Sequence, residues 1–180
     1  MSTPLLPLKD LADRHIGLTF ELAASYLQAA QVCLDLHHSP PVEFILQDEQ
    51  REMVVTVVWE PPDERMRNAW AYQTTAIEDG AYACALAAAE LMFGLVAVKR
   101  AETLTGADFY VVPIGKPINN LKEWIRLEIS GTQSDEVEVK TRLRQKVKQA
   151  AAGRSNLPAV AIVVGFKVRL IKAQTVGGAL

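Results

Sequence analysis

The spacing of hydrophobic residues divides the chain into a helical N-terminal part, a hairpin and a longer α/β part. Between residues 11 and 36 apolar side chains recur at steps of three and four, which predicts one long amphipathic helix. Pro40 and Pro41 follow, and two successive prolines cannot continue a helix. Residues 42–46 and 53–59 are rich in β-branched and aromatic side chains and flank a polar segment, so they predict a β-hairpin.

After a proline-rich break and another helical stretch, the pattern becomes that of an α/β unit. The alanine-rich segment 76–93 predicts a helix that lies flat against a sheet, and Gly94 ends it as a C-cap residue does. Residues 168–171 predict a short edge strand. Between this helix and this edge strand we expect three strands, at residues 95–101, 108–114 and 124–130. A helix at residues 135–152 and a strand buried on both faces, at residues 159–166, would follow them.

Length and composition favour a single globular domain. A chain of 180 residues is long enough to bury a core, and 49% hydrophobic with 22% charged residues argues against disorder. We therefore expect one α/β domain over residues 1–180 with a mixed sheet. It would consist of a helix-hairpin-helix extension over residues 1–75 and an αβββαβ core over residues 76–171.

The charge, the cysteines and the hydropathy pattern restrict location and partners. A formal net charge of −2 provides no global positive field, so nucleic-acid binding requires a local basic patch. Cys33 and Cys84 fall in apolar helical patterns and are expected to be buried thiols rather than a disulfide, and no Cys/His spacing suggests a zinc site. Without a secretory pattern or an apolar run of about 18 residues, we expect a cytoplasmic protein with no membrane association.

One strand carries a polar face that is suited to a functional site. In residues 125–130 the alternation of a strand places Arg126, Glu128 and Ser130 on one face and aliphatic side chains on the other. Burying a carboxylate there is costly unless it is paired or binds a metal. Both explanations remain open for Glu128, with Arg126 or another basic group as the partner in an ion pair.

Two further carboxylates belong to predicted elements that precede this strand along the chain. Glu78 lies near the start of the alanine-rich helix, and Asp108 opens the second strand just after a turn containing Gly106. Each also has a structural explanation. An acid in the first turns of a helix suits the helix dipole, and an Asp after a glycine turn often bonds its own backbone.

The order of elements and these three acids resemble the core of the PD-(D/E)XK nuclease superfamily over residues 76–166. The resemblance implies that Asp108 and Glu128 hold Mg²⁺ or Mn²⁺, that Glu78 assists, and that these three residues are catalytic. A hard divalent cation prefers carboxylate oxygens and can activate water for phosphodiester cleavage. The implied activity is that of a metal-dependent nuclease-like phosphodiesterase acting on DNA.

The chain departs from the family motif at one position. The family's Glu-x-Lys reads Glu128-Ile129-Ser130, and a neutral serine cannot replace the charge of lysine. Lys99 on the preceding strand or Lys140 on the following helix are candidates to substitute. The alternative is a catalytically inactive nuclease-fold protein that serves as a partner-binding or nucleic-acid-binding module. In either case we expect a homo-oligomer or a protein partner.

The helix at residues 135–152 carries the basic cluster of the chain. Five cations beside the acids would hold a phosphate backbone. Arg142 and Lys146 lie on one flank of the apolar stripe, while the other flank carries Lys140, Arg144 and Lys148. The alternative is a solvated helix whose later turns carry cations that suit its dipole.

Overall fold

The computed structural model describes residues 2–178 and 180. The strands are β1 (Val42–Gln47), β2 (Glu52–Val57), β3 (Leu95–Arg100), β4 (Phe109–Pro113), β5 (Ile125–Thr132), β6 (Ala159–Gly165) and β7 (Leu170–Val176). The helices are α1 (Leu11–Arg14), α2 (Phe20–Asp35), α3 (Glu64–Ala69), α4 (Gln73–Phe93) and α5 (Glu136–Ala152), with a 3₁₀ turn at Leu121–Glu123. The predicted order of elements for residues 76–166 is present as α4, β3, β4, β5, α5 and β6.

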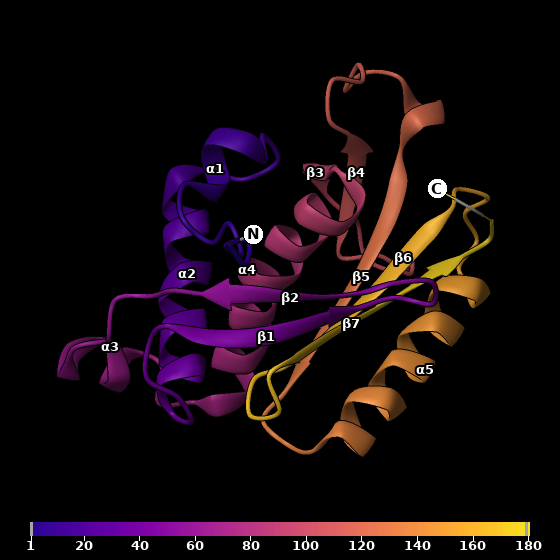
Figure 1. The fold of residues 1–180 in the computed structure, drawn as a ribbon. Helices are drawn as coiled ribbons and strands as arrows, with labels where there is room; N and C mark the ends of the chain where they lie inside the picture. Colours follow the sequence, from indigo (N-terminus) through magenta and orange to yellow (C-terminus); the bar gives the residue numbers. More distant parts are fainter. Residues whose placement is uncertain (1, 179) are drawn as a thin grey trace.

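Within the described residues, seven strands form one mixed sheet in the order β2-β1-β7-β6-β5-β4-β3 (Figure 1). The expected α/β class with a mixed sheet is confirmed. Strands β5 and β6 are parallel, as are β1 and β7, and the other neighbours are antiparallel. Helix α4 packs on β3, β5 and β6, with α2 outside it, and α5 packs on β5, β6 and β7 from the opposite face.

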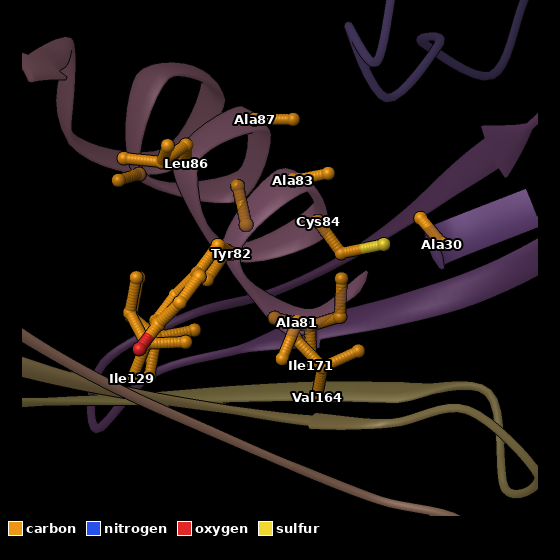
Figure 2. Packing of buried hydrophobic residues seen from close by; sticks show 14 of the residues in the cluster. Ala30, Ala81, Tyr82, Ala83, Cys84, Leu86, Ala87, Ile129, Val164 and Ile171 are labelled. Carbon is orange, nitrogen blue, oxygen red and sulfur yellow. The ribbon is translucent and has the colours of Figure 1, made fainter. Parts of the chain in front are cut away.

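Helix α4 is buried between the sheet and α2, which explains its composition. Figure 2 shows Ala81 facing Val164 and Ile171 of the sheet, while Cys84 faces Ala30 of α2. A helix covered on both sides is apolar around most of its circumference rather than along one stripe. The expectation that small side chains let this helix lie flat against the sheet is confirmed.

The two cysteines are buried free thiols, as expected. Burial raises the pKa of Cys33 to about 12, so its thiol stays protonated. In the part of the chain that the structure describes, no helix has both the length and the apolar character needed to cross a membrane.

The prediction of one helix over residues 11–36 is wrong, because the chain pairs with a sheet edge in the middle of that segment. Helix α1 ends after Arg14, and Gly17 donates its N–H to the Ala97 carbonyl of β3 at 3.0 Å. A Cβ on Gly17 would lie 2.7 Å from main-chain atoms of β3, so only glycine fits here. Thr19 then caps α2 by accepting the Leu22 N–H at 3.1 Å.

The short edge strand predicted at residues 168–171 is instead the interior strand β7. It pairs antiparallel with β6 and parallel with β1, so the hairpin β1-β2 extends the same sheet as the predicted core. The polar residues Gln174 and Thr175 interrupt the apolar pattern, which is why the sequence predicts a shorter strand. The strand continues to Val176 because its main chain is paired with β6.

The N-terminal segment covers both outer strands of the sheet. Thr56 of β2 donates its N–H to the Pro4 carbonyl at 2.8 Å and accepts the Leu6 N–H at 2.9 Å. At the other edge, Ala97 of β3 donates its N–H to Nδ1 of His15 at 2.9 Å. Covering exposed strand edges in this way limits pairing with other chains.

Candidate active site

A pocket opens where β4 begins beside the longer strand β5. Within the described chain, β4 pairs with β5 only over Phe109 to Val111, so the second half of β5 borders a pocket of about 280 Å³ on this side. Both layers of helices contribute to its wall, α4 from one face of the sheet and α5 from the other. The lining residues are Thr74, Ile77, Glu78, Tyr82, Asp108, Ile129, Ser130, Gly131, Thr132, Arg142 and Lys146.

The structure brings some of the predicted site residues together and separates others. The pocket is lined by the acids Glu78 and Asp108 and by Arg142 and Lys146 from the basic cluster. The predicted acid Glu128 is buried directly behind Lys146. The other three cations of the cluster, Lys140, Arg144 and Lys148, are exposed on α5 outside the pocket wall.

Asp108 is held by the main chain of β5. Its Oδ2 accepts the N–H of Ile129 at 2.7 Å, and its own N–H donates to the Leu127 carbonyl at 2.8 Å. The side chain therefore extends the pairing of β4 with β5 by one step. These bonds fix the carboxylate at the pocket, with Oδ1 directed to the Tyr82 hydroxyl at 3.3 Å.

Tyr82 connects the acids of the pocket, and the sequence analysis missed it. Its hydroxyl lies 3.0 Å from Oε1 of Glu78 and 3.3 Å from Oδ1 of Asp108, and it accepts a hydrogen bond from Arg100 at 3.0 Å. Burial raises the pKa of this phenol, and the charge of Asp108 adds to the shift, so Tyr82 remains a neutral donor. Figure 2 shows its ring extending from α4 toward the sheet beside Ile129.

A signal for Tyr82 was present in the sequence. Residues 78 and 82 are four apart on a predicted helix, so a tyrosine and a glutamate at these positions share one face. The connection to Asp108 and Arg100 depends on the packing of α4 against β3 and β4 and was not available from spacing.

Glu128 forms an ion pair with Lys146 across β5 and α5. The Nζ of Lys146 donates to Oε2 of Glu128 at 2.7 Å, and the two side chains are 23% and 6% exposed. Burial raises the pKa of Glu128 above its ordinary value. The hydrogen bond from Lys146 opposes this shift, whereas the negative charge of Asp108 adds to it.

Arg126, the partner first considered for Glu128, has a structural role instead. Its guanidinium is buried and donates to the carbonyl of Ala150 at 2.8 Å and to that of Leu157 at 3.0 Å. These bonds satisfy carbonyl groups at the C-terminal end of α5 and in the following loop. Arg126 therefore anchors α5 to β5, and this anchoring helps to place Lys146.

Neither lysine proposed to replace the missing motif lysine lies at the pocket. Lys99 pairs with Glu102 at the surface, and Lys140 pairs with Glu136 at 2.7 Å on the exposed side of α5. Ser130 receives a long hydrogen bond of 3.4 Å from Arg142. The ammonium that reaches an acid belongs to Lys146, which pairs with Glu128 and which the sequence places only in the phosphate-binding basic cluster.

Comparison with known proteins finds no match: no family model fits the chain, and no curated protein or solved structure is significantly similar to it. Over residues 2–178 and 180, no three His, Cys, Asp or Glu side chains form a metal-binding group. The chemistry of the pocket is therefore the basis for assigning a function.

Proposed function

We propose that this chain is a metal-dependent phosphodiesterase with a restriction-endonuclease-like core that acts on DNA. The observation that carries the proposal is the position of Lys146, whose ammonium lies 2.7 Å from Glu128 and lines the same pocket as Asp108. A lysine from α5 thereby supplies the positive charge that Ser130 lacks. The order α4, β3, β4, β5, α5, β6 supports the proposed core.

The donor groups around the pocket suit Mg²⁺ or Mn²⁺. Asp108 and Glu128 would hold the ion, and Glu78, exposed at the pocket rim, would assist through a water molecule. Carboxylates such as Glu128 of β5 and Asp108 just before β4 are the oxygen ligands that these hard cations prefer. When bound, the ion would supply Lewis acidity and lower the pKa of a water molecule.

The protein groups around the acids have distinct tasks in this proposal. Lys146 has three donors and would balance the negative charge that develops on the phosphoryl oxygens. Arg142 on the same wall would orient the phosphate. Tyr82 and the Ile129 N–H hold Asp108 in a single orientation, so that its carboxylate is preorganised before substrate binds.

The second candidate is a catalytically inactive protein of this fold that binds nucleic acid or a protein partner. The pairing of both acids favours it: Glu128 is neutralised by Lys146, and each oxygen of Asp108 has a protein donor within 3.3 Å. In this case the ammonium would serve as a permanent counter-charge to Glu128.

The deciding experiment is Mn²⁺ titration by calorimetry, alone and with a short DNA duplex. The variants are Asp108→Asn and Glu128→Ala, with Glu136→Gln as the matched control, because Glu136 is an exposed acid of α5 that pairs with Lys140 at the surface. We expect binding by the wild type and the control and its loss in the other two. Cleavage of the duplex in Mn²⁺ would then be assayed. The absence of Mn²⁺ binding under both conditions would exclude the enzyme, and DNA binding without Mn²⁺ binding would support the second candidate.

A further inference from the structure

Arg100 lies beside the pocket in an arrangement typical of an anion-binding arginine. It is the last residue of β3 and is exposed. Its guanidinium carbon lies 4.5 Å from the ring centre of Tyr82 and 4.7 Å from that of Phe109. Stacking on two rings fixes the plane of the guanidinium, so less side-chain entropy is lost when its remaining donors bind a ligand.

The hydrogen-bonding capacity of Arg100 is largely unused. Among the described residues its guanidinium donates one hydrogen bond, to the Tyr82 hydroxyl at 3.0 Å, and takes part in no ion pair. A guanidinium has five N–H donors in a planar fork that matches the oxygens of a phosphate. The stacked, unpaired Arg100 therefore has donors available for a ligand.

The position of Arg100 complements that of the cations on α5. Arg100 stacks on Tyr82 of α4 and thus lies on the α4 face of the sheet, whereas Arg142 and Lys146 approach from the α5 face. Asp108 lies between them, within 3.3 Å of the Tyr82 hydroxyl that Arg100 contacts. A chain of phosphates that crosses this edge of the sheet would meet cations on both sides of the acids.

We infer that Arg100 binds a backbone phosphate of a polynucleotide on the side of the pocket opposite Arg142 and Lys146. This inference rests on the proposed function and specifies its substrate as a strand with phosphates flanking the one at Asp108. The cations on two faces define the path of the strand across the site.

A purely structural role for Arg100 makes a different prediction. As a counter-charge that holds Tyr82 beside Glu78 and Asp108, Arg100 would support metal binding, so its removal would weaken the affinity for Mn²⁺. As a phosphate ligand, it repels the metal, so its removal leaves the affinity for Mn²⁺ unchanged or raises it while DNA binding weakens.

The test measures binding of a fluorescent 12-nucleotide single strand by anisotropy, at several salt concentrations with Mn²⁺ present, and Mn²⁺ affinity by calorimetry. The variants are Arg100→Gln and Arg100→Lys. Lys122→Gln is the matched control because Lys122 is exposed near the opposite end of β5. Circular dichroism melting verifies that each variant is folded.

We expect Arg100→Gln to weaken strand binding about tenfold, the loss of one charge-assisted hydrogen-bonded contact. The slope of log K against log salt should become shallower by about 0.7, as expected for one phosphate contact on a single strand. Arg100→Lys should retain the slope and lose part of the affinity.

The inference would be overturned if Arg100→Gln had the same strand affinity and salt slope as Lys122→Gln. It would also be overturned if Arg100→Gln bound Mn²⁺ more weakly and left the salt slope unchanged. Failure of the proposed function is seen separately, in the wild type, as no Mn²⁺ binding with or without duplex.

Discussion

The ammonium of Lys146 lies 2.7 Å from Oε2 of Glu128, and this contact joins α5 to the middle of β5. Glu128 is 6% and Lys146 23% exposed, so the pair is mostly desolvated. In such a pair, removal of one partner leaves an uncompensated buried charge, while removal of both is far less costly. The pair therefore makes a thermodynamic prediction that does not depend on function.

Lys146→Met is expected to lower the free energy of unfolding by about 3 kcal/mol. The double variant Glu128→Gln/Lys146→Met should recover most of this loss, because no buried charge remains. Urea denaturation measures both. The control is Lys140→Met, which breaks an exposed, solvent-screened pair with Glu136 and should cost much less than Lys146→Met. Equal losses of unfolding free energy in Lys146→Met and Lys140→Met would show that the buried pair contributes no more to stability than the exposed pair.

The raised pKa of Glu128 predicts the pH dependence of metal binding in the proposed function. Below this pKa the carboxyl is protonated and competes with the ion, so Mn²⁺ affinity should rise with pH above the ordinary glutamate value of about 4.3. The rise should level off once Glu128 is ionised. Calorimetry at several pH values measures it, and an affinity that does not change with pH above the ordinary glutamate value would contradict the assignment of Glu128 as a ligand.

The same shift affects stability without metal. The folded state favours the protonated form of Glu128, so its contribution is complete below the ordinary pKa and is lost as pH rises through the raised value. The stability of the wild type relative to Glu128→Gln should therefore decrease as pH rises. Denaturation of both proteins at matched pH values checks the sign.

His15 predicts the opposite pH dependence. It is fully buried, its Nδ1 accepts the Ala97 N–H at 2.9 Å, and its Nε2 lies 3.2 Å from Oε2 of Glu90. Burial lowers the pKa of His15, and the charge of Glu90 opposes this shift without reversing it. The neutral ring is thus the form that the fold requires.

The contribution of His15 is complete above the unfolded histidine pKa of about 6.5 and is lost as pH falls below it. We expect the wild type to lose stability between pH 7.5 and 5 relative to His15→Asn, whose amide oxygen can still accept the Ala97 N–H (the interval is set by the ordinary value of about 6.5). Thermal melts across this range measure the difference. Parallel pH profiles for the two proteins would contradict the prediction.

Gly131 sets the distance between β5 and α4 at the pocket. A Cβ at this position would lie 2.8 Å from Cβ of Ala81 and 2.9 Å from the Ile77 carbonyl oxygen. Gly131→Ala should therefore push α4 away from the sheet and lower stability by about 2 kcal/mol. Urea denaturation measures this, with the neighbouring Ser130→Ala as the control. A loss no greater than that of Ser130→Ala would show that α4 shifts without cost.

Much of the architecture was predictable because local patterns report local structure. The alanine-rich segment predicted a helix that lies flat against a sheet, and alternation in residues 125–130 placed Glu128 and Ser130 on one face. The phase of α5 likewise set Arg142 and Lys146 on one flank, and in the structure both line the pocket. In each case the relevant neighbours are a few residues apart in sequence.

Contacts between distant segments could not be obtained in this way. Helical periodicity continued through Gly17, yet pairing with Ala97 of β3 breaks the helix there. Strand alternation put Arg126 beside Glu128, but Arg126 extends to the carbonyls at the end of α5, and the partner of Glu128 is Lys146. The sequence determined the order of elements and which side chains share a face. Only the tertiary structure decided which faces meet, because pairing depends on packing between segments that no spacing along the chain encodes.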